Sequence, residues 1–460
     1  MSIKKSLAAG ALALALPMSA MAATDFKING FANAGFAWVD SSETYLFSDK
    51  DGSFNESSFM GLQMRFAPNV DVPISFVTQL IARGRDDWNL EADWAYVSWQ
   101  ATEDFTVNVG RVKLPIFLIS EAYDVGVTYP WIAPPEEIYG FANIPFTAMT
   151  GFNLDYNHFF DETWINAKFY MGRDNMSIPT MGTDIPGEIT RMYGASFSFG
   201  TESLELRASV STVEFSMQIS DAVSSLPIAQ NLQAEAGAAM MTATGLLALL
   251  NAAGDGTSNG NADAQETLAA LGIVPGDYGT KQTETIEDLK KSYIEGQFNQ
   301  SLFAAVPNGN GEAEFYSAGM RYDGDSIFFM TEVARRSVRG LPFPDSNTGF
   351  VTLGYRLNKM MPHFTYSVHE SEDSILVNQT QTSAILGLRY DIQPWAALKF
   401  EAQYIELGDD NIRTSGPLAG TDQAALPSTG LFNELPALDT FTGDVPDEVI
   451  KLQVAYTMVF

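Results

Sequence analysis

Eight basic residues lie where alternating polarity predicts the polar face of β-strands. They are Arg65, Arg83, Arg207, Arg321, Arg336, Arg356, Arg389 and Lys399. A guanidinium or ammonium group stays charged at neutral pH and attracts anions. Placed together around water, such groups could sort small solutes by charge. Each of them could equally pair with a nearby carboxylate and have no selective role.

Segment 113–148 supplies the candidate acidic side chains. It is rich in apolar and aromatic residues, and prolines stiffen it. A solvated surface loop would be more polar, so we expect this segment to pack against protein, most simply inside a barrel. Its carboxylates would then face the basic residues across a narrow aqueous gap, which creates a transverse field. These carboxylates belong to Glu121, Asp124, Glu136 and Glu137.

The sequence offers little for catalysis. His158, His363 and His369 are its only histidines, and none has a compelling serine–acid partner of the kind that activates a nucleophile. There is no D-x-D-x-D-G loop for calcium. We therefore expect no catalytic residue, no metal and no cofactor. The formal charge of −30 at pH 7 lacks the basic footprint of a nucleic-acid-binding protein, which excludes that class.

The elements that must position these residues are short alternating segments. A β-strand points successive side chains to opposite faces, so alternation predicts one apolar and one polar face. Sixteen segments fit, with lengths near those that a tilted membrane strand requires. They span 26–39, 57–67, 72–84, 90–101, 104–112, 149–159, 163–172, 190–199, 203–214, 313–322, 326–336, 348–357, 362–370, 381–391, 395–405 and 449–460. The expected fold is all-β: a transmembrane antiparallel β-barrel.

The links between these segments differ by parity. Links after even-numbered segments are short and turn-like. Links after odd-numbered segments are mostly long, with 85–89 as the brief exception. The long links are 40–56, 113–148, 173–189, 215–312, 337–347, 371–380 and 406–448. Outer-membrane barrels have short periplasmic turns and long extracellular loops, so both termini are expected on the periplasmic side.

The two ends of the chain agree with export to an outer membrane. Lys4 and Lys5 precede a short apolar stretch, and Ala-Met-Ala at 20–22 fits a cleavage site, so 1–22 is a predicted signal peptide. The mature chain, 23–460, has no apolar run long enough for a spanning helix and no cysteine. Its final strand ends on an aromatic residue, Phe460.

The link 215–312 interrupts the strand pattern. Ala234 to Ala253 is rich in good helix formers, Gly254 to Asn261 is predicted to be flexible, and a second helix is expected near Thr283. We expect helices that cover or enter the barrel mouth; a mobile surface excursion is the alternative.

With these features the chain resembles the trimeric porin superfamily of Gram-negative outer membranes. Residues 105–115, F-T-V-N-V-G-R-V-K-L-P, and the following Y-P-W-I-A-P-P-E are the most family-like stretch. The resemblance implies a homotrimer in a bilayer with lipopolysaccharide, and a pore constricted by 113–148. It also implies that the barrel-assembly machinery reads Phe460. The P-E-F-G-G-type stretch of general porins is missing, which leaves open which carboxylates form the constriction.

Three functions compete. The first is a passive diffusion channel for small hydrophilic solutes and ions, either anion-preferring or with an ordinary mixed-charge constriction. The second is a structural or adhesive barrel with a plugged lumen, against which the many arginines argue because a plug would have to satisfy them. The third, an outer-membrane enzyme, lacks a catalytic constellation in the sequence. We expect the channel.

Overall fold

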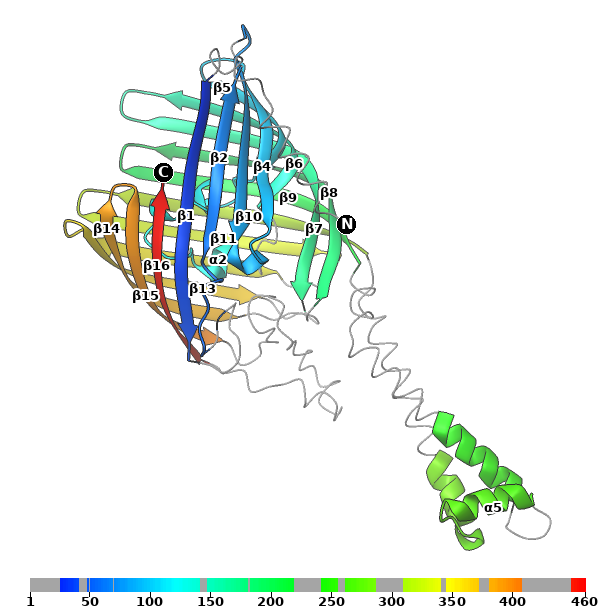
Figure 1. Ribbon diagram of the computed structural model, residues 1–460. Coiled ribbons are helices and arrows are strands. Elements are labelled where there is room, and N and C mark those ends of the chain that lie inside the picture. The colour runs from blue at the N-terminus through cyan, green and yellow to red at the C-terminus, as the bar shows by residue number, and fades with distance from the viewer. Residues whose placement is uncertain are drawn as a thin grey trace. The chain divides into compact units, whose positions relative to one another are not determined.

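Sixteen strands in the described part of the chain form one closed antiparallel barrel (Figure 1). The computed structural model describes residues 25–40, 48, 50–68, 70–140, 147–180, 183–218, 241–254, 261–286, 309–340, 345–371, 380–407 and 448–460. The strands are β1 (Asp25–Val39), β2 (Phe59–Ala67), β3 (Ile74–Arg83), β4 (Leu90–Gln100), β5 (Phe105–Lys113), β6 (Ala148–Phe159), β7 (Trp164–Thr180), β8 (Thr183–Gly200), β9 (Leu204–Met217), β10 (Gly309–Asp323), β11 (Ile327–Arg339), β12 (Ser346–Tyr355), β13 (Met360–Ser371), β14 (Gln381–Gln393), β15 (Ala396–Leu407) and β16 (Glu448–Val459). The prediction of sixteen antiparallel strands is confirmed.

The two terminal strands close the barrel. β1 and β16, blue and red in Figure 1, pair in the register Phe31↔Val459. Beyond this pair, the Phe460 amide donates to the Gly30 carbonyl at 2.8 Å, and the Gly30 amide donates to the Phe460 carbonyl at 2.6 Å. The Phe460 ring lies where a side chain on residue 30 would be, so a larger residue there would require the ring to move. Closure leaves no unpaired edge between β1 and β16.

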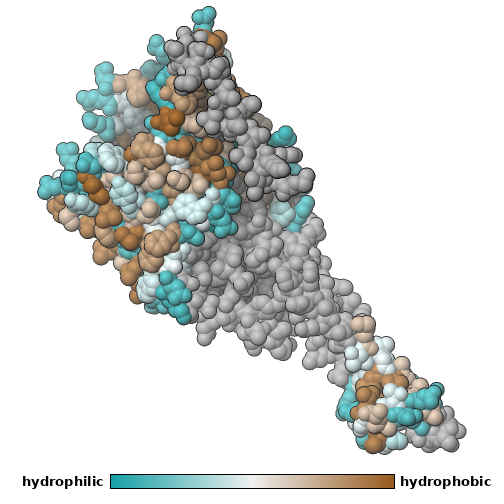
Figure 2. All heavy atoms as spheres, viewed as in Figure 1, coloured by the Kyte–Doolittle hydropathy of each residue, from teal (hydrophilic) through white to brown (hydrophobic). Residues whose placement is uncertain are grey.

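The two faces of each strand differ as the alternation predicts. On β13, Phe364 and Tyr366 keep 49% and 46% of their surface exposed. Thr365 and Ser367, which alternate with them along the strand, are fully buried. Figure 2 shows apolar residues gathered over the outer face that carries β1, β15 and β16. The inner face is polar, and many of its side chains are buried. A segment of the chain must therefore lie inside the barrel and cover them.

One expected long link is mostly strand. β7 continues to Thr180 and β8 begins at Thr183, so most of 173–189 is a two-stranded ribbon. Pro179 and Pro186 obscured this in the sequence because proline lacks the amide that a central strand needs. Among the described residues, β6 pairs with β7 only as far as Arg173, so β8 is the one described strand that pairs with β7 at Pro179.

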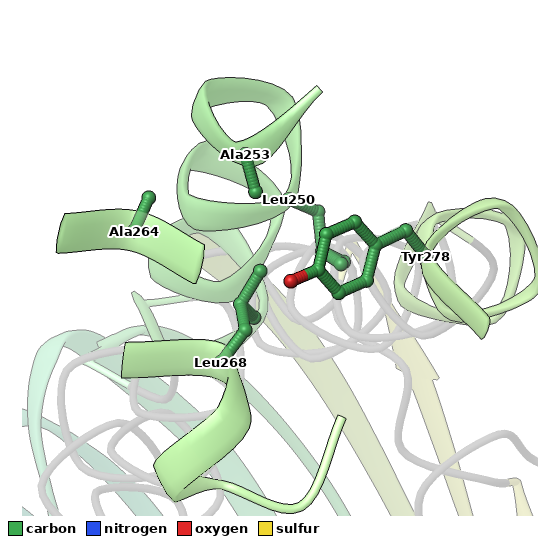
Figure 3. Packing of buried hydrophobic residues seen from close by; sticks show 5 residues of the cluster. All are labelled: Leu250, Ala253, Ala264, Leu268 and Tyr278. Atoms are coloured by element: carbon green, nitrogen blue, oxygen red, sulfur yellow. The ribbon is translucent and has the colours of Figure 1, made fainter. Parts of the chain in front are cut away.

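Residues 218–309 form a second compact unit, separate from the barrel residues. Residues 241–253 and 278–286 are helical, in the two regions where helices are expected. A third helix, α5 (Ala262–Ala270), was not predicted; the Asn261 side chain caps it by accepting from the Ala264 amide at 3.0 Å. A small apolar core holds the unit together (Figure 3). It contains Leu250, Ala253, Ala264, Leu268 and Tyr278.

The helices do not alter the all-β fold. Among the described residues, none has the combined length and apolar character that a membrane-spanning helix requires. The predicted signal peptide at 1–22, residues 234–240 of the first predicted helix and most of the link 406–448 lie outside the described residues.

Candidate functional site

The segment after β5 lies inside the barrel and forms the core of the site. It contains two single-turn 3-10 helices, η3 (Ser120–Ala122) and η4 (Gly126–Thr128), and a short α-helix, α2 (Glu136–Tyr139). Trp131 and Ile138 are fully buried. Figure 1 shows α2 within the ring of strands. We call residues 114–140 the lumen loop; residues 141–146 lie outside the described part of the chain.

Wall carboxylates hold the backbone of the lumen loop. Buried amide and carbonyl groups need partners, and an irregular segment cannot supply all of them itself. The Leu118 amide donates to Glu332 Oε1 on β11 at 2.8 Å. The Ile132 amide donates to Glu401 Oε1 on β15 at 2.7 Å. These two wall residues attach the loop to the barrel wall at two points, Leu118 and Ile132.

Wall cations hold the carbonyl groups of the same loop. Lys399 Nζ donates to the carbonyls of Gly126 at 2.6 Å and Tyr129 at 3.1 Å, and also to that of Trp131. Arg389 donates to the carbonyls of Val127 at 2.8 Å and Tyr129 at 3.1 Å. Two of the predicted basic residues therefore bind protein backbone and do not face open water.

Arg83 and Asp124 are brought together as expected, within a larger cluster. Arg83 NH2 lies 2.9 Å from Asp124 Oδ1 and 3.6 Å from Asp93 Oδ1. Lys113 Nζ lies 2.8 Å from Asp93 Oδ2 and 2.9 Å from Asp124 Oδ2. Burial acts to raise the pKa of the Asp124 carboxyl, but Lys113 and Arg83 hold it well below its usual range. The cluster fixes the base of the lumen loop against β3, β4 and β5.

Glu121 meets cations on the opposite side of the loop. Its carboxylate pairs with Lys168 on β7 and lies 3.1 Å from Arg207 NH2 on β9. Burial acts to raise its pKa, yet Lys168 and then Arg207 lower the pKa to about 2, although 36% of the side chain remains accessible. Lys168 was missed in the sequence; its position between Asn166 and Tyr170 on the polar face of a predicted strand was the available signal.

The remaining predicted cations are scattered. Arg321 and Arg356 share Asp323 at a short turn, at 2.9 Å and 2.5 Å. Arg336 lies at the far end of β11, opposite Ser346. Arg65 is exposed and forms no ion pair with the residues that the structure describes. The predicted basic residues therefore do not form a continuous basic wall. Most of them form ion pairs with nearby carboxylates or donate hydrogen bonds to carbonyls of the lumen loop.

Glu137 has a different role from the expected one. Its carboxylate accepts from Ser367 Oγ and from Gln381 Nε2, each at 2.8 Å, and its carbonyl lies 3.1 Å from His369 Nδ1. No ion pair with a cation of the described chain is formed. The prediction that Glu137 faces basic groups is wrong, because α2 turns it toward β13 and β14, whose inner side chains there are neutral.

Glu136 faces a cavity of about 50 Å³ at the long-link end of the barrel. The lumen loop forms one side of this cavity, and the residues before β2 and after β3 form the other. Arg85, in the 3-10 helix η2 (Gly84–Asp86), also lines it. Burial raises the pKa of the Glu136 carboxyl to about 7, with Lys451 and Arg85 lowering it and Glu56 and Glu137 raising it.

The histidines do not form a catalytic arrangement in the described residues. His158 Nδ1 lies 3.0 Å from Asp104 Oδ2, and His369 contacts the Glu137 carbonyl. His363 is buried with neither ring nitrogen hydrogen-bonded. No described group of three or more histidine, aspartate or glutamate residues is placed to hold a metal ion.

Comparison with solved structures identifies the architecture. An anion-selective porin from Comamonas acidovorans superposes with a TM-score of 0.51 at 10% identity, over 95% of this chain and 100% of that one. The chain has the porin fold. Salmonella typhi OmpF gives a TM-score of 0.47 at 11% identity, over 95% of this chain and 98% of that one. A loop-deleted OmpT of Vibrio cholerae gives a TM-score of 0.48 at 10% identity, over 95% of this chain and 100% of that one.

Of the comparisons with known proteins, the comparison of structures returns the porin fold. No protein-family model matches the sequence, and no curated protein matches it. At 10% identity the porin fold specifies the barrel and leaves the lining of the lumen to this chain's own residues.

Proposed function

We propose that this protein is an outer-membrane channel through which small hydrophilic solutes and ions diffuse passively. A closed sixteen-stranded barrel can hold an aqueous lumen. The observation that carries the proposal is the charged cavity between the lumen loop and the β2–β3 wall, where side chains of both signs line one space. Such a constriction sorts solutes by size and charge without an energy source.

The porin fold and the features of the sequence support the proposed setting. The outward apolar residues would contact lipid, with lipopolysaccharide around the long-link end, and three copies would associate as a homotrimer. The signal peptide would direct export, and the barrel-assembly machinery would recognise the strand that ends at Phe460. Anion preference, which the solved Comamonas acidovorans porin has by its description, would be weak here because carboxylates neutralise most wall cations.

A plugged structural barrel is the second candidate. It is favoured by the lumen loop itself, which contacts strands around much of the wall and satisfies Arg389 and Lys399, charges that would otherwise demand water. An enzymatic function has no such support, since the hydrogen bonds of the described histidines include no serine hydroxyl. We therefore propose no catalytic activity.

Single-channel recording separates the two candidates. The folded, mature protein is added to planar bilayers in symmetric potassium chloride, with its folding first verified by heat-dependent migration in gels. Stable conductance steps, in groups of three for a trimer, are the result expected of the channel. Folded protein that inserts and carries no current would reject the channel and favour the plugged barrel.

A further inference from the structure

Three inward side chains lie in one row across the neighbouring strands β2, β3 and β4. Arg65 is paired with Val77 in the β2–β3 register, and Val77 is paired with Tyr96 in the β3–β4 register. Val97, the next residue of β4, lies on the exposed apolar face outside the barrel. The charge of Glu121 in the lumen loop acts on the Tyr96 phenol. The row therefore belongs to the wall of the lumen.

The part of this row on β3 and β4 is apolar and aromatic. Trp94 precedes Tyr96 by two residues on the same face of β4. The centroids of the two rings are 5.9 Å apart, with 36° between the ring planes. Val77 lies on the neighbouring strand, and all three side chains are only partly buried. We call Val77, Trp94 and Tyr96 the ring platform, because exposed rings offer a surface on which a further flat ring can stack.

Arg65 supplies a positive charge at the edge of the ring platform. It is exposed, and it forms no ion pair or hydrogen bond with the residues that the structure describes. The two carboxylates that act on the Tyr96 phenol, those of Glu121 and Asp155, both form ion pairs with wall cations. These cations offset their negative charge, whereas the charge of Arg65 is available to a solute. A guanidinium can bind a carboxylate through two parallel hydrogen bonds.

We propose that Arg65 and the ring platform form a binding subsite for aromatic carboxylates, of which benzoate is the simplest. This inference rests on the proposed channel function and names a solute class for it. The ring of the solute stacks on the platform, and its carboxylate accepts two hydrogen bonds from Arg65. Two strand spacings, about 10 Å, separate the backbones at Arg65 and Tyr96, a span that an arginine side chain and a ring acid bridge together.

Solutes with only one of the two features fit the subsite less well. A small carboxylate such as acetate leaves the ring platform in water. A neutral ring such as benzyl alcohol leaves Arg65 without an anion. A sugar such as glucose offers the guanidinium only neutral hydroxyl groups, which accept weaker hydrogen bonds than a carboxylate does. The combination of a flat apolar body and one negative charge therefore distinguishes the proposed solute.

The test is the block of single-channel potassium chloride current by added sodium benzoate at neutral pH. A solute bound to the wall narrows the lumen, so we expect the current to fall as benzoate is added and the concentration for half block to be measurable. Acetate, benzyl alcohol and glucose are the comparison solutes. Each should require at least about tenfold more for the same block, because each lacks the ring stacking or the charge-assisted hydrogen bonds.

Two substitutions should weaken the benzoate block. Arg65→Gln removes the partner of the carboxylate and should raise the concentration for half block at least about tenfold. Trp94→Leu removes one stacking ring and should raise it about threefold or more. Their matched controls are Arg356→Gln, at the short turn where Arg356 pairs with Asp323, and Trp99→Leu, on the outward face of β4. Both control channels should be blocked like the wild type.

Each variant is recorded only after heat-dependent migration in gels shows that it is folded. Equal block by benzoate and by acetate or benzyl alcohol would overturn the subsite and leave the channel intact. The same conclusion follows if glucose blocks better than benzoate, or if Arg65→Gln and Arg356→Gln shift the block equally. Absence of current in the folded wild type would overturn both the channel and the subsite.

Discussion

At the scale of residues, the charges of the inner wall act first on the protein's own backbone. Lys399 and Glu401 occupy alternate inward positions on β15; one binds loop carbonyls and the other a loop amide. Leaving a buried carbonyl without a donor costs about 1–3 kcal/mol. The charged residues of the wall would look selective in the sequence, but their main effect here is to hold an irregular loop.

Lys399→Met should loosen the lumen loop. The methionine fills similar space but leaves the Gly126 and Trp131 carbonyls without this donor, at about 2–6 kcal/mol in total. The Tyr129 carbonyl keeps its bond from Arg389. We expect limited proteolysis of the folded protein within 114–140 to become at least about tenfold faster, since each 1.4 kcal/mol changes the open population tenfold. Lys359→Met is the control, because exposed Lys359 bonds the Ile392 carbonyl at 3.1 Å outside the lumen. Equal protease resistance in both variants would contradict the anchoring role.

At the scale of elements, the β1–β16 seam decides whether the barrel closes. The seam ends where the Phe460 ring covers Gly30, so two residues 430 positions apart must fit each other. Strand alternation sets the faces of both strands, and the hydrogen bonds between Gly30 and Phe460 extend their pairing to the last residue. A side chain at position 30 would displace the ring from the seam.

Gly30→Val should impair folding into the closed barrel. The valine would collide with the Phe460 ring, although valine itself suits a β-strand. We expect a smaller fraction of folded protein, measured by heat-dependent gel migration after refolding into lipid vesicles. Ala32→Val, two residues further on the same strand, is the control and should fold like the wild type. If Gly30→Val also folds normally, the ring does not need that space.

At the scale of the whole molecule, the chain builds two compact units. The barrel residues and residues 218–309 each have internal contacts of their own, and the helical unit has its own apolar core. Since β9 and β10 are neighbours in the sheet, a short turn can replace the insertion without changing the order of strands.

Replacing residues 219–308 with a short glycine-rich turn should leave the barrel intact. We expect the thermal unfolding temperature of the barrel to change by only a few degrees, because no strand pairing depends on the helical core. Differential scanning calorimetry in detergent is the measurement. Replacement of residues 116–139 by an equally long Gly/Ser linker is the contrast, and should lower that temperature clearly. A collapse of the barrel after the first replacement would show that the two units stabilise each other.

The barrel could be predicted from the sequence without the structure. Alternation repeats every two residues, so sixteen strands, their inward faces and the closing strand at 449–460 could all be predicted from neighbouring residues. It also placed 113–148 inside by composition. The β7–β8 ribbon was missed because its prolines argue against a strand. The helix α5 was missed because it is short and its apolar residues do not form a clear helical pattern.

The roles of the charged residues depend on the tertiary structure. Lys399 meets the Gly126 carbonyl across 273 positions, and Arg85 shares a cavity with Glu136 of a different loop. Whether an arginine faces water, a carboxylate or a carbonyl depends on how the lumen loop crosses the barrel. That course is fixed by contacts with distant strands, and no local pattern of residues encodes it.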